Sequence, residues 1–310
     1  FDGEEKSFRV ASGSQSTSDK SKIGTVFNSL IHRVMVKKPF IEAGLAINGV
    51  SSREFAVNSR DIIRGTINWG NNLETKVDDL EIRAKILGNA FNTKTVTGNQ
   101  GIYDTLQNSL IWDKFSISQF AEVNPGDFGS VDFSISPIPL FSTTDGILSD
   151  PYITIEVSIT GKQLIEGYEP VELNNSESKV IKVYSDVSLS TKALYYGGAF
   201  KNTGSIPPKA EKETTYTIVW SITNTSNNIS KAEVRAILPT WVRFAGPVSP
   251  STEDVTFNSS TREVLWKAGK IPKGAGITSG TREVSFQIAL TPLFSHINST
   301  PVLINDAILT

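Results

Sequence analysis

The sequence contains no cysteine, one methionine and two histidines. Without cysteine there is no disulfide framework, no thiolate metal site and no cysteine nucleophile. The histidines, His32 and His296, stand in unrelated contexts beside apolar runs. Neither has a second histidine nearby, so the sequence offers no histidine-based metal site. The absence of cysteine is compatible with both a cytosolic and an extracellular location.

Long apolar runs and an excess of one charge are also missing. No segment approaches the ~18 consecutive apolar residues of a membrane-spanning helix, and no signal peptide is recognisable. We therefore expect any membrane anchor to lie outside these residues. With 30 Lys and Arg against 32 Asp and Glu, the formal net charge is −2. Because this charge provides no basic surface for a polyanion, the sequence argues against nucleic-acid binding.

Enzyme motifs are scarce as well. No His-Glu-x-x-His helix, phosphate-binding glycine loop or Gly-x-Ser-x-Gly turn occurs. Ser176 and Lys179 have a Ser-x-x-Lys spacing, but they lie in a predicted loop without the companion motifs. Asp127-Phe128-Gly129 has no kinase lobe around it. The sequence therefore predicts neither enzymatic activity nor a cofactor, and no catalytic residue is assigned.

What the sequence does contain is a repeat, because several segments recur with an offset of roughly 150 residues. The recurring pairs are Gly65–Trp69 and Tyr216–Trp220, Glu81–Ala84 and Glu233–Ala236, Leu110–Trp112 and Val264–Trp266, Val131–Ile135 and Val284–Ile288, and Pro139–Phe141 and Pro292–Phe294. Tandem copies of one domain are typical of extended proteins that span a distance or display a surface, rather than of enzymes with one catalytic cleft.

Each copy has the pattern of an antiparallel β-sandwich. Apolar and polar residues alternate in short runs bounded by Gly, Pro, Asn or Ser, and no window sustains a helical period. The best helical candidate is Ile117–Val123, which is expected to form one or two turns at most. Strands are predicted at residues 36–48, 62–69, 81–87, 109–112, 131–135 and 153–159, and at 183–196, 216–223, 232–238, 263–266, 283–290 and 302–308.

The five tryptophans are interpreted from this pattern. Trp69, Trp112, Trp220 and Trp266 are predicted to fill the cores, since a tryptophan in an alternating strand packs between the sheets. Trp241 follows a proline at a strand end, where it is either a local loop plug or an exposed contact.

The repeat also predicts the domain boundaries. Residues 36–182 are expected to form the first sandwich and residues 183–310 the second. Residues 1–35 resemble the last part of a preceding repeat, because Phe8–Val10 resembles Val157–Ile159 and Asn28-Ser29 resembles Asn175-Ser176.

The second copy has no counterpart of residues 161–182, so it is expected to be either truncated or complemented by strands from elsewhere. Residues 1–35 are accordingly either the tail of a preceding repeat or strands donated to another molecule.

The second copy resembles a known family. Pro207–Trp220, followed by Ile222-Thr-Asn-Thr-Ser226 and Ala232–Pro239, resembles the Ig-like repeat of bacterial surface proteins, in which a strand ending in "tVtNtG/S" precedes "v.v...LP". Phe257–Trp266 resembles the later hairpin of that repeat, and Gly269–Gly274 its following turn. The likeness is greatest to large secreted, membrane-tethered proteins of candidate-phylum bacteria.

This resemblance covers residues 183–310 well and residues 36–182 more loosely, since Gly88-Asn89 stands where the repeat has Leu-Pro. It implies an all-β fold of tandem immunoglobulin-like antiparallel β-sandwiches. It also implies an extracellular stalk, adhesin or envelope component with no catalytic residues to carry over.

Two kinds of site are weighed. Calcium is the one cofactor considered, because aspartates lie in or beside predicted loops, although none has an EF-hand spacing and turn-forming aspartates are the alternative. The candidates are Asp78, Asp79, Asp127, Asp132, Asp145 and Asp150. A Lys192–Asn305 isopeptide bond is the second kind, although the first copy has Thr154 or Ile155 in place of Asn305.

These features predict a non-catalytic extracellular stalk or structural protein of a bacterial envelope, or a surface fibre or layer. Its expected partners are further copies, head-to-tail or in a tandem array, or other envelope proteins. One alternative is an adhesin whose loops recognise a glycan or a protein, with Tyr195, Tyr196 and Trp241 as the contact residues. Another is an accessory region of a secreted enzyme.

Overall fold

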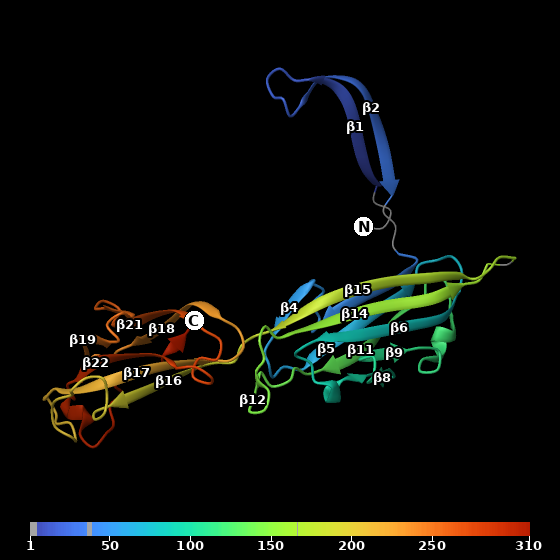
Figure 1. The fold of residues 1–310 in the computed structure, drawn as a ribbon. Coiled ribbons are helices and arrows are strands. Elements are labelled where there is room, and N and C mark those ends of the chain that lie inside the picture. The colour runs from blue at the N-terminus through green and yellow to red at the C-terminus, as the bar shows by residue number, and fades with distance from the viewer. Residues whose placement is uncertain (1–4, 36–38, 166) are drawn as a thin grey trace.

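The computed structural model describes residues 5–35, 39–165 and 167–310. These residues form a two-stranded hairpin and two β-sandwiches (Figure 1). Within these ranges, no helix is long and apolar enough to cross a membrane. Residues 36–38 of the predicted opening strand and residues 1–4 lie outside the described residues.

The hairpin consists of β1 (Glu5–Gln15) and β2 (Ile23–Met35), which pair antiparallel. Neither strand pairs with any other described strand. In Figure 1 the hairpin stands apart from both sandwiches, and nearly all of its described side chains are exposed. The origin proposed above for residues 1–35 stays a prediction.

Sandwich 1 is built from the strands β3 to β15. Its larger sheet contains, in spatial order, β4 (Glu54–Val57), β15 (Val171–Val183), β14 (Tyr152–Gln163), β6 (Val77–Gly88), β9 (Ser109–Trp112) and β8 (Ile102–Asp104), with β10 (Glu122–Val123) also paired to β6. The facing sheet contains β3 (Ile41–Ile47), β5 (Ile63–Asn71), β11 (Phe128–Ile135) and β7 (Thr97–Gly98). A short hairpin joins β12 (Phe141–Ser142) and β13 (Gly146–Ile147). The strand pairs are antiparallel except that β4 runs parallel to β15.

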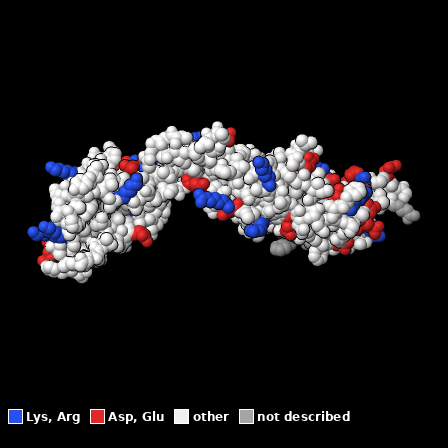
Figure 2. All heavy atoms as spheres, turned by 90° about the horizontal axis from the view of Figure 1, so that it is seen from below, with Lys and Arg blue, Asp and Glu red and all other residues white. Residues whose placement is uncertain are grey.

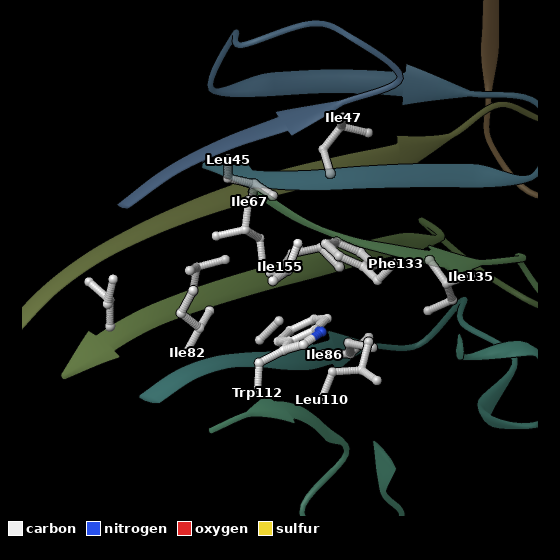
Figure 3. Close-up of a cluster of buried hydrophobic side chains, with 14 of the residues drawn as sticks. Leu45, Ile47, Ile67, Ile82, Ile86, Leu110, Trp112, Phe133, Ile135 and Ile155 are labelled. Atoms are coloured by element: carbon white, nitrogen blue, oxygen red, sulfur yellow. The ribbon is translucent and has the colours of Figure 1, made fainter. Parts of the chain in front are cut away.

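The core of sandwich 1 follows from the alternation of its strands. Since successive side chains of a strand point to opposite faces, every second residue enters the space between the sheets. Ile67 and Phe133 enter it from one sheet, and Ile82, Trp112 and Ile155 enter it from the other (Figure 3). All five side chains are buried.

Sandwich 2 repeats this plan with fewer strands. One sheet contains β16 (Val187–Leu194), β17 (Thr214–Asn224), β22 (Arg282–Leu290) and β19 (Val242–Ser249). The other contains β20 (Asp254–Asn258), β21 (Glu263–Ile271), β18 (Ile229–Ile237) and β23 (Ile308–Leu309). Trp220, Trp266 and Phe286 are fully buried in its core.

The fold class predicted from the sequence is confirmed, and so is the burial of Trp69, Trp112, Trp220 and Trp266. Trp241 is partly buried against the core of sandwich 2, and its indole Nε1 donates to the carbonyl oxygen of Val302 at 2.9 Å. It therefore acts as a loop plug.

The short helical segment predicted at residues 117–123 is one 3₁₀ turn, Ser118–Ala121, followed directly by β10. Two local predictions are wrong. The predicted strand at residues 302–308 is reduced to Ile308–Leu309. The predicted loop around Ser176–Lys179 is part of the long strand β15.

Candidate functional site

The edge of sandwich 1 beside β3 is covered by β15. The side-chain amide of Asn175 on β15 donates to the carbonyl oxygen of Ile41 at 2.9 Å. The carboxylate of Glu177 accepts a hydrogen bond from the backbone N–H of Leu45 at 2.6 Å. Because β15 lies across β3, the side chains of Ile41, Leu45 and Ile47 are buried.

Sandwich 2 has no described strand in the position of β15. The registers of the two domains show which residues correspond, since Ile41 of β3 lies opposite Asn71 and Val187 of β16 lies opposite Asn224. The buried residues Ile41, Leu45 and Ile47 of β3 thus correspond, in this order, to three residues of β16. These are Val187, Thr191 and Ala193, and all three are exposed.

An apolar groove follows this uncovered part of β16. It is lined by Val187, Leu189, Ile229, Ala232, Ile271, Leu309 and Thr310. In the neighbouring sheet, β23 is the only described strand on the outer side of β18, with Val234 opposite Leu309 and Arg235 opposite Ile308. Backbone hydrogen bonds also join Glu233 to Thr310 and Ile237 to Asn305. We call this groove, with the adjoining part of β18, the open edge of sandwich 2.

The β1–β2 hairpin carries the second uncovered apolar surface. Phe8 lies directly opposite His32, and Val10 lies opposite Leu30. These four residues share one face, because directly opposed residues of an antiparallel pair point the same way. Phe8, Val10 and Leu30 are 59%, 68% and 69% exposed. We call this surface the apolar face of the hairpin.

Charge is distributed without a dominant sign. Figure 2 shows acidic and basic side chains interspersed over the face that it presents. The repeated Glu-x-Arg pairs form ion pairs on the outside of the two sandwiches, Glu81 with Arg83 at 2.9 Å and Glu233 with Arg235 at 2.8 Å. Exposed pairs of this kind contribute about 0–1 kcal/mol.

The aspartates considered for calcium do not gather in one place. Among the described residues, no group of three or more His, Cys, Asp or Glu side chains could hold a metal ion. Asp79 forms an ion pair with Lys114 at 2.5 Å, and this hydrogen bond holds the pKa of the Asp79 carboxyl below its usual value. Calcium binding stays a prediction, and thermal unfolding with and without calcium tests it.

The other five aspartates are spread over separate turns and strands. The carboxylate of Asp127 accepts from the backbone N–H of Asn124 in a turn, and that of Asp145 accepts from hydroxyl groups of its own turn. Asp132 on β11 accepts from the hydroxyl of Thr66 at 2.7 Å. The remaining two are Asp78 in β6 and Asp150, which has a φ of 47°.

The predicted aromatic contact residues divide into two groups. Tyr195 and Tyr196 pack edge-to-face with ring centroids 4.7 Å apart. Trp241 instead packs against His296, with centroids 4.6 Å apart. Among the described residues no ring contact joins Trp241 to either tyrosine.

The predicted isopeptide partners are also separate. Lys192 lies on β16, in one sheet of sandwich 2, opposite Val219. Asn305 lies beside β18 in the other sheet, where its backbone N–H donates to Ile237. Both side chains are exposed, whereas the reaction requires a buried pair beside an acid. The structure does not bring this pair together.

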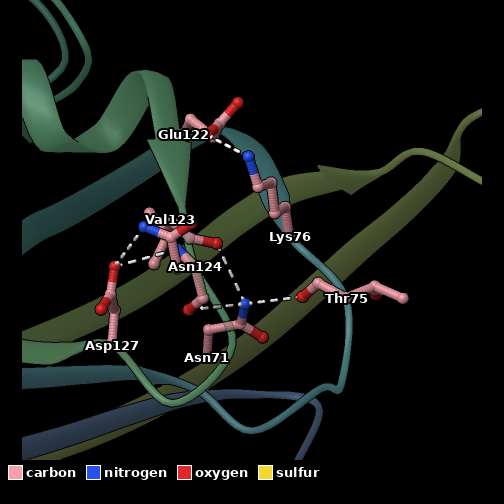
Figure 4. Close-up of polar contacts among 7 residues, drawn as sticks. All are labelled: Asn71, Thr75, Lys76, Glu122, Val123, Asn124 and Asp127. Carbon is pink, nitrogen blue, oxygen red and sulfur yellow. Dashed lines mark hydrogen bonds and ion pairs between the residues drawn. The ribbon is translucent and has the colours of Figure 1, made fainter.

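Sequence reasoning missed a pair of buried asparagines. The side-chain amide of Asn71 donates to the carbonyl oxygens of Thr75, Val123 and Asn124 at 2.9–3.1 Å (Figure 4). It thereby joins the loops at one end of sandwich 1. The sequence did contain a signal for this pair. It is the asparagine of the "tVtNtG/S" pattern quoted above, which is Asn224 in the second copy.

No protein-family model and no curated protein matches this sequence. Solved structures do match. The C-terminal domain of the Streptococcus pyogenes antigen I/II-family protein AspA matches 82% of this chain and 92% of its own, with 11% identity and a TM-score of 0.35. BcpA, the major pilin subunit of Bacillus cereus, matches 97% of this chain and 73% of its own, with 11% identity and a TM-score of 0.31.

An enzyme is also among the matches. A GH20 exo-β-N-acetylglucosaminidase from Vibrio harveyi matches 62% of this chain but 24% of its own, with 10% identity and a TM-score of 0.25. TM-scores as low as these do not carry a function from any of the three proteins to this chain.

Proposed function

We propose that this chain is a non-catalytic structural component of a bacterial cell surface, in which the two sandwiches form a semi-rigid extracellular spacer. The observation that carries the proposal is the junction between the sandwiches. β15 ends at Val183 and β16 begins at Val187, so only residues 184–186 connect the two cores. A connection this short restricts the relative motion of two domains when both contact it.

Both sandwiches do contact it. The Ser59 hydroxyl of sandwich 1 donates to the carboxylate of Asp186 at 2.6 Å, and the backbone N–H of Asp186 donates to the hydroxyl of Thr225 in sandwich 2 at 2.8 Å. Across the junction, the Lys273 ammonium donates to the hydroxyl of Ser149 at 3.0 Å. These contacts favour a preferred angle between the sandwiches over free rotation.

Small-angle X-ray scattering of the dilute chain tests the spacer. The double substitution Asp186→Ala, Lys273→Ala removes the bonds from Asp186 to Ser59 and from Lys273 to Ser149, and it is expected to broaden the distribution of interatomic distances. The matched control, Asp254→Ala with Lys267→Ala, removes an ion pair within sandwich 2. The proposal fails if the unaltered chain already scatters as two freely jointed bodies.

A second candidate function is recognition of a glycan or a protein by the loops of sandwich 2. A groove there is lined largely by apolar residues, among them Pro207, Pro208, Tyr216, Leu293 and Ile297. Ile297 is 60% exposed. A glycan array probed with the unaltered chain and with Ile297→Lys tests this candidate, which requires a signal that the substitution removes.

A further inference from the structure

The apolar face of the hairpin requires a cover. A two-stranded ribbon is marginally stable in water, and an apolar sheet face is normally buried against another layer. The opposite face carries Arg9 opposite Ile31 and Ser7 opposite Arg33, so it is the more polar one. The face with Phe8, Val10 and Leu30 is therefore the one that would be buried.

The hairpin resembles the pair of strands that covers β3 in sandwich 1. β1 and β2 contain 11 and 13 residues, and β14 and β15 contain 12 and 13. Both pairs are antiparallel hairpins that lead through a short connection into the first strand of a sandwich, β3 in one case and β16 in the other. The likeness of Phe8–Val10 to Val157–Ile159 places Phe8 and Val10 on the inward face of β14. The likeness of Asn28 to Asn175 places them two residues away, at Ile155 and Val157, which keeps them on the same face. Ile155, Val157 and Ile159 are all buried in sandwich 1.

The open edge of sandwich 2 matches the surface that such a hairpin covers. In sandwich 1, β14 pairs with β6 while β15 lies across β3. In sandwich 2 the corresponding strands are β18 and β16. Their shared groove is lined by Val187, Leu189, Ile229, Ala232 and Ile271, and also by Leu309 and Thr310 of the segment that the hairpin would displace.

The only described strand on the outer side of β18 is the two-residue β23. Asn305 and Thr310 add backbone hydrogen bonds to Ile237 and Glu233 of β18, so a hairpin at this edge would exchange these bonds for its own longer ladder.

The open edge and the hairpin of one chain lie at different ends of sandwich 1. β5 begins close to Ser59, which contacts the junction through Asp186, and ends at Asn71. β3 begins with Ile41 opposite Asn71, so the hairpin joins sandwich 1 at the end away from the junction. Because sandwich 1 separates the hairpin from the open edge of its own chain, we take the open edge of a second copy as its partner.

We infer that the hairpin of one copy completes sandwich 2 of a second copy of this chain, with β1 beside β18 in place of β23 and β2 across β16. This inference rests on the proposed structural function and names its partner. The contact is heterologous, because the hairpin meets a surface unlike itself, and repetition of such a contact produces open head-to-tail fibres.

Light scattering coupled to size-exclusion chromatography, from micromolar to millimolar concentration, measures the association. Leu30→Lys places a charge on the apolar face of the hairpin and is expected to weaken association about a hundredfold. Ile31→Lys is the matched control, because it makes the same change one residue along on the other face and is expected to leave the association nearly unchanged. Both positions are exposed in the single chain, so neither change should affect its folding.

The acceptor surface has its own pair of variants. Val187→Lys alters the open edge and is expected to weaken association as Leu30→Lys does, whereas Ser188→Lys, on the opposite face of β16, is the control. A mixture of Leu30→Lys and Val187→Lys chains retains one intact hairpin and one intact open edge. The mixture should therefore form one-to-one dimers and no longer assemblies.

A chain that stays monomeric at all concentrations overturns the inference, whatever else covers the hairpin. So does an assembly that Leu30→Lys disrupts and Val187→Lys leaves intact, because hairpins would then pair with each other. The outcome is separable from the proposed function, since the Leu30→Lys chain still reports the rigidity of the junction by X-ray scattering.

Discussion

Asn71 and Asn224 occupy the same position in the two sandwiches, and each joins the loops at its strand end through one side-chain amide. The amide of Asn224 donates to the carbonyl oxygens of Asn227, Ile271 and Pro272 at 2.6, 3.4 and 3.0 Å. Both asparagines are at most 2% exposed. Because both amides are shielded from solvent, water cannot replace their hydrogen bonds to the loops.

Removing either amide should destabilise the corresponding sandwich. Asn71→Ala removes the amide donor of the Thr75, Val123 and Asn124 carbonyl oxygens, of which Asn124 keeps the backbone N–H of Asp127. It is expected to cost about 2–4 kcal/mol in the free energy of unfolding of sandwich 1. Asn224→Ala should have a similar effect on sandwich 2. Urea denaturation measures both, and Asn72→Ala, at an exposed residue with one hydrogen bond to Pro39, is the control. Equal effects of Asn71→Ala and Asn72→Ala would contradict the role of the buried amide.

Gly65 on β5 should tolerate no side chain. A Cβ at this position would lie 2.0 Å from the Cζ of Phe133, the residue directly opposite on β11. Phe133 is buried, so Gly65→Ala forces the core to shift and is expected to cost about 1–3 kcal/mol. Gly44 on the neighbouring strand β3 is the matched control, since a Cβ there meets only Asn68 at 3.9 Å. Similar unfolding midpoints for the two variants would refute this account.

Lys179 is the buried charge of sandwich 1. Its side chain is 1% exposed, its ammonium donates to the carbonyl oxygens of Ser51 and Ser52, and Glu177 lies 3.6 Å away. Lys179→Met keeps the length of the side chain but leaves these acceptors unpaired, and we expect a loss of about 2–4 kcal/mol. The same change at Lys182, whose partner is the exposed Glu54, should cost at most about 1 kcal/mol. Chemical denaturation of both variants gives the comparison.

Tyr216 should limit the stability of sandwich 2 at alkaline pH. Burial raises the pKa of the Tyr216 hydroxyl above its ordinary value of about 10, and the neighbouring Tyr195 raises it further. The unfolded chain thus ionises first, so the stability that this group contributes is fully present below pH ~10 and is lost as the pH rises through the folded pKa. In Tyr216→Phe, the temperature of thermal unfolding should fall less between pH 9 and about 11 than it does in the unaltered chain. Tyr196→Phe is the control, because Tyr196 is 77% exposed and its removal should leave this pH dependence unchanged.

The repeat in the sequence predicted the strands well but misaligned two of its tryptophans. The motifs place Trp69 and Trp220 at equivalent positions. In the structure, however, Val131 of β11 pairs with Ile67 while its counterpart Val284 pairs with Trp220. Trp220 therefore corresponds to Ile67. A slip of two residues keeps every side chain on its own face, so alternation by itself could not reveal it.

The strand β15 was missed for a different reason. Its inward positions include Asn175, Glu177 and Lys179, which do not read as an apolar face. These residues instead hydrogen-bond to the backbone of β3 and of the loop before β4. Such bonds depend on partners more than 120 positions away in the sequence, so a local pattern could not predict them.

The sequence by itself determined the all-β class, the tandem repeat and the burial of Trp69, Trp112, Trp220 and Trp266. Alternating polarity decides which face of a strand is buried, and that information is local. The tertiary structure alone decided that β15 covers β3, and that among the described residues neither β16 nor the hairpin has such a cover. Which strand lies at an edge depends on pairing between distant segments, and the sequence of a strand specifies its faces far better than its neighbours.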